Sequence, residues 1–206
     1  MKTKNIFLLL VVILTLIILF YSFTGSQDQT TYIDEIRKER EEKDLFMKTS
    51  EESPFAENKN TFKGLRYFLP DARYKVTATL TPIHDKKVVM LTTNDGKEDR
   101  YIEYANAEFE LEGRHNKLLI LEIMETGPSR GKLFLAFGDE TSARETYGAG
   151  RYLDVNKASG SNTLSLDFNK AYNPYCAYTG KFSCPLPPPE NLLTIPIRAG
   201  EQTYEP

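Results

Sequence analysis

The chain is poor in the residue types that build common metal and catalytic sites. It has no tryptophan, and among its 206 residues only two are histidines and two are cysteines. His84 and His115 leave little scope for a histidine-based metal site or a histidine-dependent triad. No GxGxxG or GxxxxGK[ST] sequence is present. The common phosphate-binding loops are therefore not indicated. No metal site is predicted, and the sequence does not identify a cofactor.

A strong positive charge is also missing. The formal net charge is −3, and lysines and arginines do not cluster outside the N-terminal third. Nucleic-acid binding usually requires a basic patch or stripe, so no nucleic-acid partner is predicted. Twelve tyrosines and twelve phenylalanines suit a β-rich core instead. The length allows one sizeable domain with an appendage.

One long apolar run stands at the N-terminus. Lys2 and Lys4 precede residues 6–23, IFLLLVVILTLIILFYSF. A run of about 18 residues is just long enough to span a bilayer and is long for a signal peptide. Basic residues before the run and acids after it predict that the N-terminus lies inside. We therefore expect a transmembrane anchor in residues 1–25 and the remainder outside the cytoplasm, a placement that cleavage after the run would not change.

A polar and strongly charged segment, residues 26–52, follows the apolar run. Charges of both signs interleave, with i,i+4 pairs such as Lys38 and Glu42. This pattern is typical of a solvated helix and predicts a stalk that ends before Pro54. A few side chains fall roughly on one face of this helix: Ile33, Ile36, Arg40 and Met47.

The rest of the chain, residues 53–206, changes to a period of two. Residues 73–83, RYKVTATLTPI, alternate polar and apolar side chains, and residues 192–197, LLTIPI, do the same. Further segments of this kind are separated by Gly, Pro and Asn turns. The pattern predicts a mainly β domain, an antiparallel sandwich or barrel of about eight or nine short strands. Pro196 favours an edge or terminal strand for the last of them.

The densest chemistry lies between Phe137 and Asn191, a block rich in acids, tyrosines, asparagines and turn residues. Such a block is costly to order unless its polar groups meet one another or a ligand. Arg151 follows a glycine-rich turn, and its guanidinium would either buttress a loop between acids or clamp a carboxylate or phosphate. The candidate ligand-binding residues are Asp139, Glu145, Tyr147, Arg151, Tyr152, Asp154, Asn169 and Tyr172.

The acids of this block have two interpretations. On adjacent strand ends, Asp139 and Asp154 could bind a hard cation or act as general acid and base. Alternatively they cap turns and pair with neighbouring cations. Ser142 and Glu145 match a capping box, which predicts a helical turn.

The only two cysteines, Cys176 and Cys184, are close in sequence. In the oxidising compartment predicted above, they are expected to form a disulfide that closes a small loop. A metal pair or a reactive thiol is the alternative, although the C-x2-C spacing and a nearby histidine are missing.

Several motifs together resemble a known family. They are FKGLRYF at 62–68, FGDETSARETYGAGRYLD at 137–154, LDFNKAYNPYCAYTGKFSCPLPPPEN at 166–191 and IRAGE at 197–201. The chain is identified from them as a member of the bacterial domain of unknown function 1684, from about Glu39 onward. The resemblance implies no activity and no catalytic residues. It does imply that the polar block is the family signature, and the family pattern has glycine where this chain has Ala143.

Three kinds of function fit these observations. The first is a membrane-anchored module that binds a small polar or anionic ligand, or a partner, at the polar block. The second is a hydrolase-like enzyme that uses the carboxylates, with or without a divalent cation. The third is a structural envelope domain whose polar block only folds its own loops. The first is the function that the sequence favours.

Overall fold

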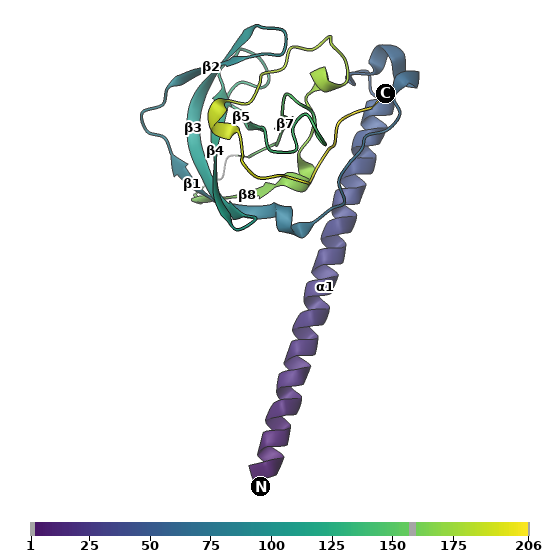
Figure 1. The fold of residues 1–206 in the computed structure, drawn as a ribbon, viewed down its shortest axis with the longest axis vertical. Helices are drawn as coiled ribbons and strands as arrows, with labels where there is room; N and C mark the ends of the chain where they lie inside the picture. Colours follow the sequence, from purple (N-terminus) through teal and green to yellow (C-terminus); the bar gives the residue numbers. More distant parts are fainter. Residues whose placement is uncertain (1–2, 157–159, 206) are drawn as a thin grey trace.

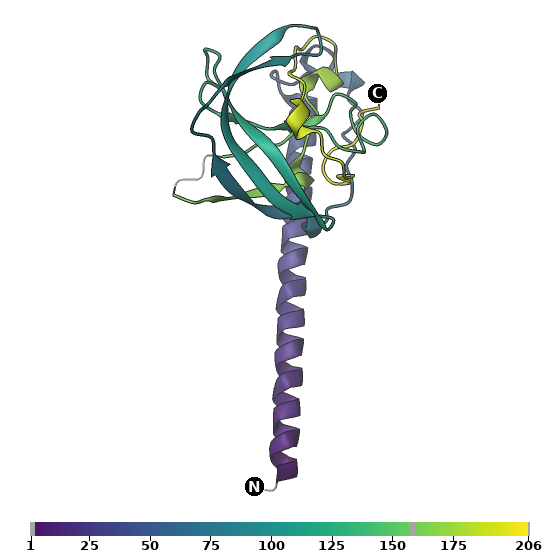
Figure 2. The ribbon, with the colours of Figure 1, turned by 60° about the vertical axis from the view of Figure 1, so that its left-hand side comes forward.

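The computed structural model describes residues 3–156 and 160–205, without the side chains of residues 3–10, 14 and 16–27. One long helix, α1 (Thr3–Thr49), runs up to a β-rich domain and lies along its side (Figures 1 and 2). Five short 3-10 helices follow at intervals: η1 (Ala56–Thr61), η2 (Ala72–Tyr74), η3 (Phe168–Lys170), η4 (Tyr175–Ala177) and η5 (Pro189–Asn191).

The predicted anchor, residues 6–23, lies in the part of α1 whose side chains are for the most part outside the described residues. Among the residues that are described, no helix combines the length and the apolar character needed to cross a bilayer.

The C-terminal half of α1 packs against the β domain. Ile36 and Met47 are each only 1% exposed, whereas Leu45 on the opposite face is 61% exposed. The expectation of a solvated stalk therefore has to be corrected for this half of the helix. Charged residues make up most of this half of the helix, which is why the sequence predicted a solvated stalk. The narrow face that carries Ile36 and Met47 is nevertheless enough to pack the helix against the domain.

The main sheet has six strands, all paired in antiparallel fashion, in the order β5-β4-β3-β1-β8, with β2 paired to β3. A second sheet joins β6 to β7. The prediction of a mainly antiparallel β domain is confirmed, and within the described residues the sheet does not close into a barrel. The strands are β1 (Lys75–Pro82), β2 (Val88–Thr92), β3 (Glu98–Leu111), β4 (Arg114–Ile123), β5 (Leu133–Phe134), β6 (Ala136–Phe137), β7 (Arg151–Tyr152) and β8 (Thr163–Asp167).

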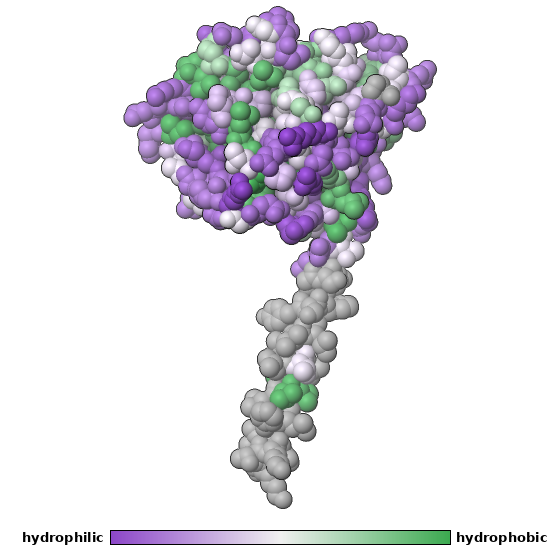
Figure 3. Space-filling view, viewed as in Figure 1, coloured by the Kyte–Doolittle hydropathy of each residue, from purple (hydrophilic) through white to green (hydrophobic). Residues whose placement is uncertain are grey.

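The alternating side chains of these strands build the core. Ala78 of β1, Ala107 of β3 and Leu166 of β8 are all 0% exposed and belong to one apolar cluster. Their polar neighbours in sequence point to the other face, as the period of two requires. The face of the domain seen in Figure 3 is accordingly mostly hydrophilic, with separate apolar patches.

The predicted strand at residues 192–197 is not formed. Leu193, Ile195 and Ile197 are buried as their alternation predicted, but the backbone there is irregular. Pro196 has no N–H to give to a ladder. The neighbouring carbonyl groups are used elsewhere, because that of Ile195 accepts from the N–H of Glu140 at 3.3 Å.

Docking of α1 can be tested with a matched pair of substitutions on the one helix. Met47→Ala removes a buried side chain and should lower the free energy of unfolding by about 2–5 kcal/mol, since it leaves a cavity against the domain. Leu45→Ala removes an exposed side chain and should change it by less than about 0.5 kcal/mol. Urea unfolding of the full chain measures both, and equal small effects would show that α1 is not docked.

Candidate functional site

The guanidinium of Arg151 is buried at the centre of the polar block. Arg151 begins β7 and is 1% exposed. One of its terminal nitrogens donates to Asp139 Oδ2 and to the carbonyl of Ile197, both at 2.9 Å. The other donates to the carbonyls of Ala199 and Glu201. Arg151 therefore buttresses the fold, the first of its two alternatives, and does not face a cavity.

Asp139 is equally committed to the fold. Its Oδ1 accepts from the backbone N–H of Thr141 at 2.7 Å, from the Thr141 hydroxyl at 2.6 Å and from the N–H of Ile197 at 3.2 Å. Burial lowers the pKa of Arg151, and the charge of Asp139 opposes that shift. Both oxygens of Asp139 are thus occupied by protein donors. Within the described chain, moreover, no three His, Cys, Asp or Glu side chains gather closely enough to hold a metal ion.

The turn after Asp139 is not the helical turn that its capping box predicts. The N–H groups of Arg144, Glu145 and Thr146 all donate to the carbonyl of Thr141, which closes a tight turn. The Glu145 side chain points outward and pairs with Arg198 at 3.0 Å. The predicted ligand residue Glu145 therefore lies at the surface, in a pair that solvent screens.

A groove of about 800 Å³ lies between α1 and the β domain. Three predicted residues line it: Asp154, Asn169 and Tyr172. The structure thus separates them from Arg151, Asp139 and Glu145, which line no part of it. The opposite wall is formed by residues of α1 that were not predicted as site residues, namely Ile36, Arg40, Lys43 and Met47.

Tyr172 joins the two walls of the groove. Its hydroxyl donates to Asp154 Oδ1 at 2.8 Å, and the Lys43 ammonium lies 4.5 Å from the centre of its ring. Burial and the charge of Asp154 raise the pKa of Tyr172, so the hydroxyl remains a donor at neutral pH. Lys43 also pairs with Glu201 at 3.0 Å, which ties α1 to the C-terminal segment.

Arg40 forms a second link across the groove. It donates to the carbonyl of Phe68 at 2.8 Å and to that of Asn169 at 3.2 Å. Its guanidinium carbon also lies 4.5 Å from the centre of the Tyr67 ring. Among the described residues, the Arg40 Nε and the Tyr67 hydroxyl are buried without a hydrogen-bond partner. Such atoms are uncommon in folded proteins. Two more among the described residues, Arg151 Nε and Asn173 Oδ1, belong to residues that do not line the groove.

Asn169 links α1 to the β domain at the groove through its side-chain amide. Its amide nitrogen donates to the Tyr32 hydroxyl and to the carbonyl of Asp71, both at 2.8 Å, and its oxygen accepts from the N–H of Asp71 at 2.9 Å. The Tyr32 hydroxyl in turn donates to Asp167 Oδ1 at 2.8 Å. Asn169 is 2% exposed, so this predicted site residue positions α1 and the domain relative to each other.

The remaining predicted tyrosines hold the segment that contains the cysteines. Tyr152 donates to the carbonyl of Pro185 at 2.7 Å, and Tyr147 donates to the sulfur of Cys176 at 3.8 Å. The predicted disulfide is not present, because Cys176 and Cys184 are both free thiols. The sulfur of Cys184 instead accepts a hydrogen bond from the N–H of Cys176 at 3.2 Å.

Glu201 is a buried neighbour of the groove residue Lys43 that the sequence analysis missed. It is 0% exposed and accepts from the side chains of Lys43, Asn173 and Tyr178. Its position in the IRAGE motif was noted only as part of a resemblance. The groove could have been predicted only from the helix face that carries Ile36, Arg40 and Met47, because these side chains line it.

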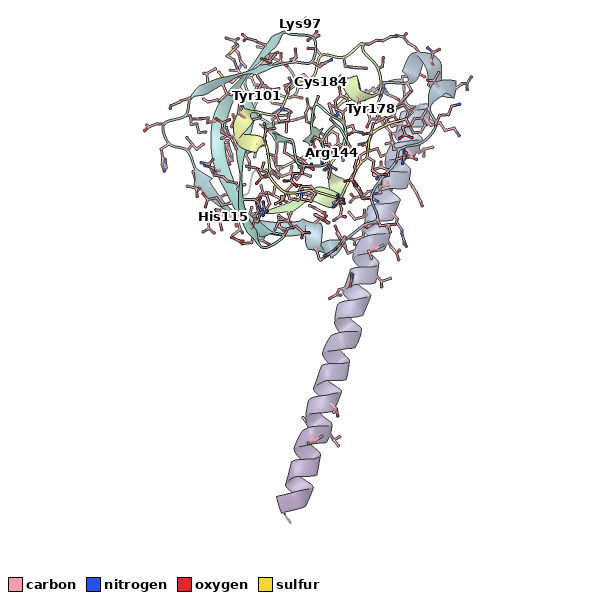
Figure 4. The ribbon with its side chains drawn as sticks, in the orientation of Figure 1. Lys97, Tyr101, His115, Arg144, Tyr178 and Cys184 are labelled. Atoms are coloured by element: carbon pink, nitrogen blue, oxygen red, sulfur yellow. The ribbon has the colours of Figure 1, made fainter. Side chains whose placement is uncertain are left out.

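Replacement of the buried guanidinium should destabilise the whole domain. Arg151→Gln leaves Asp139 as an unpaired buried charge and strips the donors from three carbonyl groups. We expect a loss of about 3–5 kcal/mol in the free energy of unfolding. Arg144→Gln, at the exposed position labelled in Figure 4, is the control and should have an effect below about 0.5 kcal/mol. Comparable denaturation curves for the two variants would contradict the buttressing role of Arg151.

The backbone conformation at position 143, where the resemblance implies glycine, also has a measurable consequence. Ala143 has φ +62°, a left-handed conformation that costs a residue with a Cβ about 1–2 kcal/mol. Ala143→Gly should therefore stabilise the chain by about 0.5–1 kcal/mol after the added entropy of the unfolded chain is allowed for. Ala149→Gly, at a position without positive φ, should destabilise it. Thermal unfolding distinguishes the two signs.

Comparison with known proteins agrees with this architecture. The family model described as a protein of unknown function (DUF1684) matches residues 60–202. The solution NMR structure of an uncharacterised protein from Haloarcula marismortui is 37% identical, covers 86% of this chain and 97% of its own, and has a TM-score of 0.64. No curated protein matches the chain. The match over most of the chain shows that it belongs to the family of proteins of unknown function DUF1684.

Proposed function

We propose that this protein binds a small ligand with an anionic group in the groove between α1 and the β domain. The observation that carries the proposal is the groove itself, which is about 800 Å³ in volume and is walled by both parts of the chain. Sites for small molecules usually have about 300–1,000 Å³ and combine apolar walls with a few polar groups.

The lining of the groove has this mixed character. Ile36, Met47 and Leu153 are buried apolar residues of its walls. Ser165 and Lys75 contribute a hydroxyl and an ammonium group from two paired strands. Such a surface favours a ligand that has an apolar body and one charged end.

The preference for an anion rests on Lys75. Lys43 and Lys170, two other lysines that line the groove, are paired with Glu201 and Glu39. Within the described part of the chain, Lys75 has no carboxylate at ion-pair distance, and its ammonium lies 4.9 Å from the centre of the Tyr32 ring. It is therefore available to a carboxylate, sulfonate or phosphate group. No comparable observation favours the hydrolase alternative, since Asp139 is enclosed by protein donors.

The proposal includes the location of the domain. The apolar run at 6–23, with Lys2 and Lys4 before it, supports a membrane anchor with the domain outside the cytoplasm. This support comes from the sequence alone. Alkaline extraction of membranes and protection of the domain from added protease test it directly.

Binding in the groove can be tested with a probe of matching chemistry. The fluorophore 8-anilinonaphthalene-1-sulfonate has an aromatic body and one sulfonate, and its fluorescence reports binding to the full chain. Ser165→Trp fills the groove and should weaken binding at least tenfold. Thr163→Trp is the matched control, because Thr163 lies two residues earlier on the same exposed face of β8 and lines no part of the groove.

Two outcomes would contradict the proposal. One is equal weakening by both tryptophan substitutions, and the other is a probe stoichiometry that does not approach one per chain. Native mass spectrometry of the purified chain complements this test, since a co-purified small molecule lost in Ser165→Trp but retained in Thr163→Trp would also identify the natural ligand class.

A further inference from the structure

Cys176 and Cys184 lie next to each other but differ in exposure. Cys176 is partly exposed in η4, whereas Cys184 is 7% exposed. The N–H of Cys176 donates to the sulfur of Cys184 at 3.2 Å, so both cysteines meet within one small loop. Cys184 and Tyr178 are both labelled in the upper half of the domain in Figure 4. Cys176 is therefore the more accessible of the two residues to a molecule arriving from solvent.

Hydrogen-bond donors surround the sulfur of Cys176. It accepts from the Tyr147 hydroxyl at 3.8 Å, and the Cys184 thiol is close enough to act on its pKa. The bond from Cys184 is the main reason that the pKa of Cys176 is lowered to about 7, and the same bond, together with burial, raises the pKa of Cys184. Burial raises the pKa of Tyr147 to about 12, so its hydroxyl remains a donor at neutral pH. These directions favour the thiolate on Cys176, the more exposed of the two residues.

The loop holds one cysteine rigidly and leaves room at the other. The N–H of Cys184 donates to Asn94 Oδ1 at 2.7 Å, and its carbonyl accepts from the N–H of Asn94 at 3.0 Å. Between the cysteines, a Cβ added at Gly180 would meet nothing within 4 Å. The loop between the cysteines is therefore not packed at this glycine.

We propose that Cys176 and Cys184 form a thiol–disulfide exchange site for small disulfides, with Cys176 as the attacking and Cys184 as the resolving thiol. The Cys176 thiolate attacks a disulfide R–S–S–R, forms a mixed disulfide and releases R–S⁻. Cys184 then gives its proton to solvent and attacks the Cys176 sulfur, which releases the second R–S⁻. The protein loses two electrons to the small disulfide, and an external thiol reverses both steps.

The assignment of the two roles follows from access and protonation. The best attacking thiol has a pKa near the ambient pH and can be reached by its substrate. A resolving thiol acts only after the mixed disulfide has formed beside it, so it can remain buried and protonated until then. This proposal is independent of the groove ligand, because neither sulfur lines the groove.

Oxidised glutathione is a suitable probe, followed by intact mass of the full, pre-reduced chain. Wild type should release two glutathiones per chain and become about two mass units lighter, because two hydrogens leave as the disulfide forms. Cys184→Ser should stop at the mixed disulfide with one glutathione bound. Cys176→Ser should not react, since only a buried, protonated thiol remains.

The pH dependence of alkylation tests the cause of the reactivity. The rate of Cys176 modification by iodoacetamide should rise through a midpoint near pH 7, because only the thiolate reacts. Tyr147→Phe and Cys184→Ala each remove a donor to the thiolate and should move this midpoint upward. Cys184→Ser keeps a hydroxyl donor and should move it less, which separates loss of the hydrogen bond from general disturbance of the loop.

Three results would overturn the proposal. A purified chain whose disulfide resists a glutathione-strength reductant without denaturation would have a structural bond instead. Modification of Cys184 before Cys176 would reverse the assigned roles. A reduced, folded chain that oxidised glutathione leaves unchanged would have no exchange site.

Discussion

The guanidinium of Arg151 determines where the last part of the folded chain lies. Removing this charge from water is costly, and Asp139 with three backbone carbonyls offsets that cost. The three carbonyls belong to residues 197–201, a segment with no strand partner in the main sheet. A side chain thus supplies the hydrogen bonds that a neighbouring strand would otherwise give. The irregular C-terminal segment is buried and fixed as a result.

The position of this segment also determines the groove. Once the backbone of Glu201 is held by Arg151, its carboxylate reaches Lys43 on α1 together with Asn173 and Tyr178. The ion pair joins the helix to the domain at the far end of the groove, and Tyr32 with Asn169 joins them nearer the N-terminal end. Most polar groups of the block therefore stabilise the fold. The groove between the block and α1 is the space that remains for a ligand.

Local patterns predicted the strands well because alternation reports which side chains are buried. The same alternation at 192–197 wrongly predicted a strand. Its apolar side chains are buried, but burial does not require a backbone that is paired in a sheet. The choice between the two predicted roles of Arg151, and the role of Lys43, could not be made from the sequence, because their partners are far away in it. Only three predicted site residues meet in the groove, and its other wall comes from a helix whose charges suggested solvation. The state of the cysteines was inferred from compartment alone, which gives no local geometry.

Hydrogen exchange along the full chain tests most directly whether the docked helix and the clamped C-terminal segment form one cooperative unit with the sheet. The account predicts that amides of residues 36–47 are protected to the same free energy of opening as those of β3 and β4. The amides of Ile197 and Glu201, which donate to Asp139 Oδ1 and to the carbonyl of Ala171, should show the same protection. Exchange of the helix at the rate of an isolated, fraying helix, with the sheet still protected, would contradict it. The groove would then have no second wall.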